Sequence, residues 1–260
     1  MTELRPFDPS AAAIPARPSH ASAHHLDGLL ASLASLEARI KAIASTIDGR
    51  IAFSTSLGLE DQVVLHAIAA SGAPIDIFML DTGRHFPETI ETVAASEARY
   101  GVHIRVVAPE ADELAALVAR DGVLGFRTSI EARKTCCDVR KVRPLDRQLV
   151  GAAAWITGLR RGQSGGRTLT PLSSFDGARD LIKLNPIADW DLPAVEAYVA
   201  RHHIPVNALH ARGFPSIGCA PCTRAILPGE DIRAGRWWWE SASGKECGLH
   251  SGAAIGDRHR

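Results

Sequence analysis

The stretch of the chain that decides the fold is Arg50-Ile-Ala-Phe-Ser-Thr-Ser-Leu-Gly-Leu-Glu-Asp61. Its first four residues, 50–53, predict a short buried strand, because they are mostly apolar and a turn of small residues follows them. The apolar residues Val63, Val64, Ala67 and Ile68 then recur at helical spacing. The stretch therefore predicts a strand, a tight turn and the start of a helix.

The turn between this strand and this helix is a candidate site for an anion. Backbone N–H groups at the start of a helix have no partner within the helix, and the helix dipole places partial positive charge there. The turn lacks the Gly-Lys-Ser/Thr ending of a Walker loop, and a plain strand-to-helix turn with a serine cap is the alternative interpretation. The candidate ligand-binding residues of this turn are Ser54, Thr55, Ser56, Gly58 and Asp61.

The rest of the core repeats the alternation of strands and helices. Further strands are predicted at 75–80, 103–107, 154–157 and 181–184, and helices after Pro87, at 114–118 and at 190–200. Strands that alternate with helices imply a parallel sheet with right-handed crossovers. We therefore expect an α/β fold over residues 25–205, with a Rossmann-like parallel sheet flanked by helices.

Two more loops follow predicted strands and carry polar side chains. Such residues lie where open α/β sheets bind ligands, outside the carboxyl ends of the strands. One loop follows the second strand, and the other, at 158–166, combines glycines with two guanidinium groups that suit oxyanions. The candidate ligand-binding residues of the two loops are Leu80, Asp81, Thr82, Gly83, Arg84, Arg160 and Arg161.

The two ends of the chain differ from the core. Residues 1–24 are rich in Ala, Pro, Ser and His and are predicted to form a flexible leader. Helical spacing of apolar residues from Leu26 to Ile47 predicts one long amphipathic helix, which Gly49 ends. Residues 206–260 are rich in Gly, Pro, Arg and Trp without a clear period, so they predict an irregular C-terminal segment with a functional role.

Composition excludes several classes of protein. The 260 residues are 46% apolar, which is enough for a sizeable core, and the formal net charge is zero, so no global field attracts nucleic acid or an anionic membrane. No apolar run approaches the ~18 residues of a membrane span, and the first residues lack the regions of a signal peptide. We expect neither nucleic acid nor membrane as a partner. A homo-oligomer is compatible with the sequence, which leaves the oligomeric state open.

The five cysteines are the strongest chemical signal in the chain. Two pairs, Cys136-Cys137 and Cys219-Ala-Pro-Cys222, predict a metal or cluster site, and Cys247 remains as a single reactive thiol. Ligand pairs for one zinc ion usually stand two to four residues apart, whereas adjacent side chains on a helix diverge by about 100°. This divergence favours a 4Fe–4S cluster, with zinc as the alternative. Free thiols spaced for metal also fit a reducing cytoplasm.

Basic residues accompany both kinds of cysteine. Arg140 and Lys141 follow the first pair, where they could offset the charge of an anionic cluster or of a bound anion. Cys247 has Lys245 and His250 nearby, and neighbouring cations lower the pKa of a thiol. A single thiol can attack an electrophile, but an external thiol must then complete the reaction.

Together these motifs resemble those of the assimilatory adenylyl-sulfate (APS) reductases of the PAPS/APS reductase family. The resemblance runs from about residue 50 to 250 and is carried by segments 54–61, 80–84, 140–145 and 157–164, the two cysteine pairs and Glu246-Cys-Gly-Leu-His250. It implies an adenine nucleotide α-hydrolase-like fold. It also implies reduction of adenosine 5′-phosphosulfate to sulfite and AMP, in sulfate assimilation and cysteine biosynthesis, by thioredoxin or a glutaredoxin-like reductant.

The resemblance also assigns roles to individual residues. It implies that Cys247 is the nucleophile and becomes an S-sulfonate, and that the paired cysteines hold a 4Fe–4S cluster that is not the electron donor. The residues implied to contact the phosphosulfate are Lys141, Arg233, Arg236 and His250, of which Lys141 and His250 join Cys247 as catalytic residues. The turn at 54–61 departs from the Ser-Gly-Gly-x-Asp loop of the related ATP pyrophosphatases, so pyrophosphate chemistry is not expected. Two alternatives stay open: a 3′-phosphoadenylyl-sulfate (PAPS) reductase, which usually lacks the paired cysteines, and a zinc-stabilised nucleotide-binding regulator without turnover.

Overall fold

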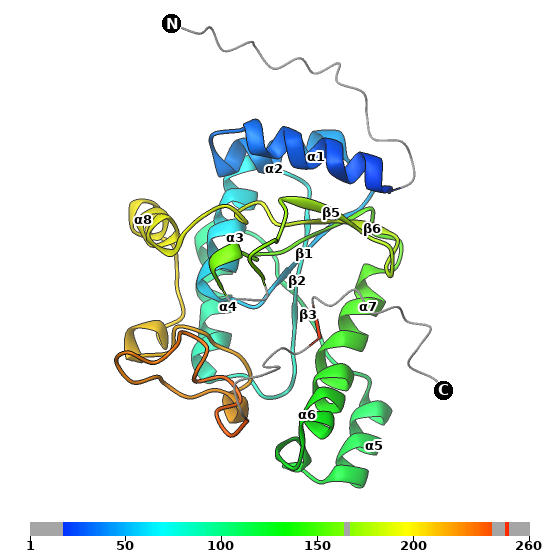
Figure 1. Cartoon of the computed structure of the whole chain (residues 1–260), viewed down its shortest axis with the longest axis vertical. Helices are drawn as coiled ribbons and strands as arrows, with labels where there is room; N and C mark the ends of the chain where they lie inside the picture. The colour runs from blue at the N-terminus through cyan, green and yellow to red at the C-terminus, as the bar shows by residue number, and fades with distance from the viewer. Residues whose placement is uncertain (1–17, 164–166, 241–247, 250–260) are drawn as a thin grey trace, which may run out of the picture.

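The structure is a computed structural model and describes residues 18–163, 167–240 and 248–249. One six-stranded sheet, in the order β3-β2-β1-β4-β6-β5, forms its centre (Figure 1). The strands are β1 (Ile51–Thr55), β2 (Asp76–Leu80), β3 (Arg105–Val107), β4 (Ala154–Ile156), β5 (Ser173–Asp176) and β6 (Leu181–Leu184). All neighbouring pairs are parallel except β5 with β6. The predicted α/β class is therefore confirmed, and β5 is a strand that the sequence analysis missed.

Helices cover both faces of this sheet. They are α1 (His20–Ser32), α2 (Leu36–Thr46), α3 (Leu59–Ser71), α4 (Pro87–Tyr100), α5 (Ala111–Asp121), α6 (Ile130–Cys137), α7 (Arg143–Leu149) and α8 (Leu192–His202). Because side chains alternate along a strand, Ile51 and Phe53 pack with α1, α2, α3 and α8, whereas Ala52 packs with α7 on the opposite face. The order of strands reverses between β1 and β4, and ligands bind at such a switch point in open α/β sheets.

The N-terminal region differs from its prediction. Two helices replace the single helix expected at 26–47, because Ser35 is extended and its side chain accepts a hydrogen bond from the N–H of Ala38, which starts α2. Helix α1 begins at His20, where Ser19 and Ser22 form a reciprocal capping box. Residues 20–24, which were predicted to belong to a flexible leader, are therefore helical, and residues 1–17 lie outside the described part of the chain.

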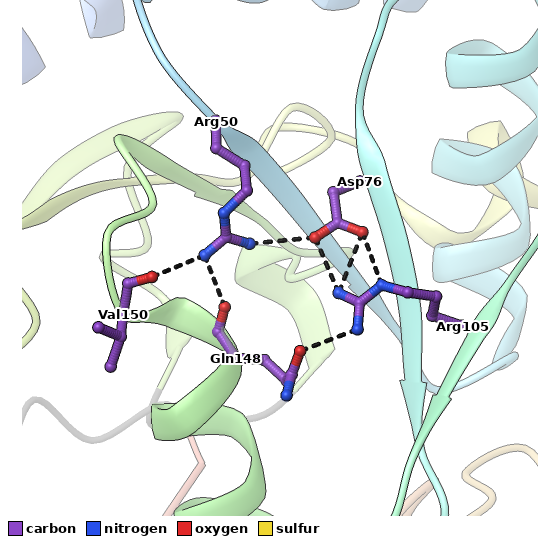
Figure 2. Close-up of polar contacts among 5 residues, drawn as sticks. All are labelled: Arg50, Asp76, Arg105, Gln148 and Val150. Carbon is purple, nitrogen blue, oxygen red and sulfur yellow. Dashed lines mark hydrogen bonds and ion pairs between the residues drawn. The ribbon is translucent and has the colours of Figure 1, made fainter.

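The carboxylate of Asp76 links the N-terminal ends of β1, β2 and β3, at the end of the sheet opposite the switch point. Asp76, at the start of β2, pairs with Arg50 at 3.0 Å and with Arg105 at 2.9 Å (Figure 2). The same two guanidiniums reach the end of α7, where Arg50 donates to the backbone oxygens of Gln148 and Val150 and Arg105 donates to the Gln148 side chain. This network fixes the N-terminal ends of the strands, which lie opposite the candidate ligand-binding loops.

From His203 to Glu240 the described chain contains only short 3-10 turns, and two hydrogen bonds hold its cysteine pair, one to the loop after β2 and one within the segment. The N–H of Ala220 donates to the carbonyl of Arg84 at 2.8 Å, and the N–H of Trp237 donates to the carbonyl of Cys222 at 3.0 Å. In the ranges that the structure describes, no helix is long and apolar enough to span a membrane.

Candidate active site

A cavity of about 220 Å³ opens beyond the carboxyl ends of β1, β2 and β4. The stretch from the end of β1 to the start of α3 supplies Ser54, Thr55, Ser56, Glu60 and Asp61, the stretch from the end of β2 to the start of α4 supplies Met79, Leu80, Thr82, His85 and Thr89, and the region after β4 supplies Thr157, Gly158, Leu159, Gln163 and Arg167. The remaining wall is Lys141, Ser216, Ile217, Gly218, Arg233, Arg236, Trp237 and Leu249. The topology therefore brings three predicted loops and three predicted cations to one cavity.

Within the turn after β1, Asp61 organises the backbone. Its carboxylate accepts hydrogen bonds from the N–H and hydroxyl of Ser56, at 2.7 and 2.6 Å, and from the N–H of Gly158, at 3.0 Å. The surrounding protein desolvates this carboxyl and raises its pKa to about 6, although the hydrogen bonds act in the opposite direction. Asp61 thus ties the β1 turn to the β4 turn, and Gly58 caps α3 without lining the cavity.

The loop after β2 presents only part of its predicted set to the cavity. Leu80 and Thr82 line it, whereas the Asp81 side chain accepts the N–H of Gly83, whose φ of 66° is left-handed. Arg84 turns away, donates to the carbonyl of Val123 at 2.6 Å and lies over the Phe126 ring. Asp81, Gly83 and Arg84 therefore shape the loop and do not line the cavity.

The predicted guanidiniums after β4 also have protein partners. Arg160 is buried and pairs with Glu60 at 2.7 Å, and Arg161 donates to the carbonyl of Thr170. Neither lines the cavity; Gln163 and Arg167 of the same region do, joined by a hydrogen bond of 2.7 Å. Arg167 could have been found in the sequence, because it is a third basic residue in the same glycine-rich region.

Two residues that the sequence analysis missed also reach the cavity. The Nε2 of His85 donates to the carbonyl of Leu80 at 2.9 Å, and burial together with nearby Lys141 lowers the pKa of His85. Ser216 accepts a hydrogen bond from Arg236 at 3.3 Å. Neither carries a sequence signal, since His85 follows a loop of many polar residues and Ser216 lies in the irregular segment.

Arg236 is held against the wall by several contacts. It is buried, donates to the carbonyl of Ile217 at 3.2 Å and lies over the ring of Trp237. A Cβ on Gly218 would lie 2.4 Å from Nη2 of Arg236, so only glycine leaves room for the guanidinium here. This packing fixes one cation of the cavity.

The four paired cysteines converge beside this cavity. They line one small pocket together with Phe126 and the cations Arg84, Arg133, Arg140 and Lys141, and none of the four forms a disulfide. The first pair lies at the end of α6, directly before a π-helical turn, η2 (Asp138–Val142). In the second pair, Cys219 precedes and Cys222 ends a short 3-10 turn, η6 (Ala220–Cys222). Segments about eighty residues apart in sequence thus supply one set of thiols.

The spacing of the four sulfurs tests which group they could hold. No three of them lie within 4.8 Å of one another. Around one zinc ion with Zn–S bonds of about 2.3 Å, four tetrahedral thiolates would stand only about 3.8 Å apart. The four sulfurs therefore stand wider apart than the thiolates of a single tetrahedral zinc site.

Lys141 lies between the two sites, because it lines both the cavity and the cysteine pocket. Burial raises the pKa of Cys222 to about 11, helped by the nearby Cys219. Burial also acts to raise the pKa of Cys219, but Lys141 and the Thr82 hydroxyl outweigh it, and the pKa is lowered. The lysine therefore favours negative charge on the cysteine side of the cavity.

Cys247 and His250, the predicted nucleophile and its neighbour, lie outside the described residues. Leu249 is described, and it lines the cavity.

The sheet topology and the cavity at its switch point define an α/β protein of the adenine nucleotide α-hydrolase-like class. The chain belongs to the phosphoadenosine phosphosulfate reductase domain family, whose pattern matches residues 50–225.

Individual relatives agree with this assignment. The chain is 54% identical over 229 residues to the adenosine 5′-phosphosulfate reductase of Agrobacterium fabrum, covering 88% of this chain and 87% of that protein. It is 52% identical over 200 residues to the protein of that name from Allochromatium vinosum, with 77% and 78% covered. The crystal structure of phosphoadenylyl-sulfate (PAPS) reductase from Candida auris, a phosphate complex, superposes with a TM-score of 0.68 at 26% identity, covering 82% of this chain and 100% of that one. These comparisons confirm the resemblance seen in the motifs.

Proposed function

We propose that this chain reduces adenosine 5′-phosphosulfate to sulfite and AMP in sulfate assimilation and cysteine biosynthesis. The carrying observation is a strand-end cavity that the turn after β1 and the cations Lys141, Arg233 and Arg236 line, with four thiols in the pocket beside it, which shares Lys141. Relatives at about half identity are named for this reaction. The enzyme is an oxidoreductase that acts on a sulfur group.

The chemical step begins at Cys247. Two residues span at most about 7 Å, so a thiol two positions before Leu249 can reach the cavity that Leu249 lines. The Cys247 thiolate attacks the sulfur of the substrate, an S–S bond forms, and the S–O bond to the phosphate breaks as AMP leaves. A thiol of reduced thioredoxin then attacks the sulfur of Cys247, sulfite departs with the bonding electrons, and the second thioredoxin thiol resolves the mixed disulfide.

The cations of the cavity supply the electrostatic part of catalysis. Lys141, Arg233 and Arg236 orient the sulfate and offset the charge that develops on the departing phosphate, and His250 joins them from the C-terminal tail. The Asp61 carboxylate ties the β1 turn to the β4 turn and so holds in place the wall against which the nucleotide lies. A cytoplasmic location suits this chemistry, because the nucleophile and the reductant both require reduced thiols.

We further propose that Cys136, Cys137, Cys219 and Cys222 hold a 4Fe–4S cluster. When bound, the cluster supplies fixed negative charge and a covalent link between the two cysteine segments, and it does not donate the electrons. The spread of the sulfurs and the surrounding cations support this choice over zinc. Lys141 is the residue through which the charge of this site reaches the cavity.

The test is turnover with each of two sulfonucleotides. With reduced thioredoxin, adenosine 5′-phosphosulfate is expected to have a much higher kcat/KM than its 3′-phosphorylated form. Equal or reversed values would instead assign the chain to the PAPS reductases, and no sulfite from either would leave a nucleotide-binding regulator.

The intermediate is tested without reductant. The reaction is expected to stop after one turnover, with one sulfonate group on Cys247 in the intact mass, and reduced thioredoxin should remove it as sulfite. Cys247→Ser should abolish turnover while AMP binding persists. Sulfite production by Cys247→Ser at the wild-type rate would contradict the mechanism.

A further inference from the structure

Three potential metal ligands meet on a part of the molecule that the reaction does not use. Glu37 lies in the first turn of α2, His66 in the middle of α3 and His202 at the end of α8. All three helices cover the same face of the sheet (Figure 1). None of the three residues lines the strand-end cavity or the cysteine pocket.

The geometry of this group is close to that of a metal site. One ligand atom from each residue lies within 4.8 Å of the other two. The rings of His66 and His202 have centroids 4.7 Å apart and are tilted by 43°, so they do not stack face to face. Three ligands around zinc, with bonds of about 2.0–2.1 Å, stand about 3.4 Å apart, so shifts of about 1 Å would complete the site.

Aromatic packing alone does not account for all the polar atoms of the group. Tyr198, one turn before His202, donates a hydrogen bond from its hydroxyl to the Glu37 carboxylate. The centroid of its ring lies 4.3 Å from the centroid of the His202 ring. The Nδ1 of His66, however, is buried and has no hydrogen-bond partner among the described residues. A buried ring nitrogen without a partner loses hydration free energy that a ligand would restore.

We propose that Glu37, His66 and His202 bind a zinc ion that links α2, α3 and α8. Two imidazole nitrogens and one carboxylate oxygen are ligands that zinc prefers, and a fourth position stays open for water. Tyr198 fixes the orientation of the carboxylate, as outer hydrogen-bond partners do at metal sites.

The charge of the group suits a cation. Glu37 contributes one negative charge, which acts on His66 more strongly than the positive charge of Arg99 does. The ion would be structural, because it joins helices whose residues are up to 165 positions apart and lies away from the substrate.

The test uses full-length, untagged protein purified anaerobically, so that the paired cysteines keep their own occupant. Zinc is added and the tightly bound fraction is studied by X-ray absorption at the zinc edge. One zinc per chain is expected, with a first shell of nitrogen and oxygen at about 2.0–2.1 Å and no sulfur at about 2.3 Å. Zinc at about one hundred times its Kd should raise Tm by about 5 °C or more.

Variants separate this site from other histidines. His66→Gln with His202→Gln should lower zinc affinity by about 100-fold or more and abolish the shift in Tm, whereas turnover of the substrate stays unchanged. His203→Asn is the matched control: His203 is exposed, adjacent in sequence and left-handed at φ 50°, which asparagine tolerates, so zinc binding should persist.

Three outcomes would overturn the proposal. They are a sulfur shell around the zinc, zinc binding that survives in the double variant, and absence of binding at micromolar zinc. If the double variant unfolds, as circular dichroism would show, Glu37→Gln decides the question. This variant keeps the shape of the side chain, and it should weaken zinc binding by about tenfold or more; unchanged affinity would refute the site.

Discussion

Gly218→Ala tests whether the fixed position of Arg236 matters for catalysis. The new Cβ would lie 2.4 Å from Nη2 and 2.6 Å from Cζ of Arg236, whereas ordinary contact begins near 3.4 Å, so the guanidinium must move by about 1 Å. The side chain can yield because the clash is with its far end. A charged hydrogen bond is worth about 1.5–3 kcal/mol, so losing one to the substrate should lower kcat/KM by about 10- to 150-fold.

The assay is sulfite release from adenosine 5′-phosphosulfate with reduced thioredoxin, together with thermal unfolding. Tm should change little, because Gly218 does not have the positive φ that an alanine would resist. Gly28→Ala in α1 is the control: its Cβ meets nothing within 4 Å, so kcat/KM should stay unchanged while the helix gains about 0.5–1 kcal/mol. Wild-type kcat/KM in Gly218→Ala would refute the reasoning that Arg236 is held in a productive position.

Three further predictions concern the sheet, the cysteines and Lys141. Burial acts to raise the pKa of Asp76, but its two arginine partners outweigh this effect and lower the pKa, so its stabilisation is present above the unfolded pKa of 3.8 and is lost as pH falls through the folded value. Asp76→Asn should therefore lower the free energy of unfolding by about 1–3 kcal/mol at pH 7 and by less in acid, as urea titrations would measure. Protein purified anaerobically should contain about four irons and four acid-labile sulfides, which Cys222→Ser should remove; active protein that holds zinc with a sulfur shell at the cysteines in place of iron would contradict the cluster. Lys141 lines both the cavity and the cysteine pocket, so Lys141→Met should lower turnover and also alter the visible spectrum of the cluster. Arg233 lines the cavity but not the cysteine pocket, so Arg233→Met should affect turnover alone.

The strands of the core could be predicted because parallel strands are buried on both faces. Strands β1, β2, β4 and β6 are runs of mostly apolar residues, and turn residues mark their ends. Strand β5 has two serines and an aspartate among its four residues, and it exists because it pairs with β6 at the edge of the sheet. The break between α1 and α2 was missed because the apolar spacing continues through it, and only the capping side chain of Ser35 marks the new start.

The candidate site was predictable where topology alone decides it. Neighbouring parallel strands have their carboxyl ends at the same end of the sheet, so the loops after β1 and β2 had to meet. The direction of a long side chain is not encoded in this way. Arg160 faces its partner Glu60 because α3 places that carboxylate beside the β4 turn, and no spacing in the sequence links the two residues. The same holds for Glu37, His66 and His202, which come from three separate helices.

The helical run 130–149 explains how the cysteine site and the cavity act on each other. Helix α6, the turn η2 and α7 follow without a gap, and π-helical turns of this kind are rare and often occur at functional sites. Arg140 in this turn donates to the carbonyl of Thr82 at 2.6 Å and so holds the loop after β2, while Lys141 borders both sites. Negative charge on the four sulfurs would therefore attract Lys141 toward the cysteines, and a bound sulfate would attract it toward the cavity. In the proposed function one ammonium group serves both anions, so the charge of the cysteine site would set how strongly the substrate is held, and this influence would require no electron to leave the cysteine site.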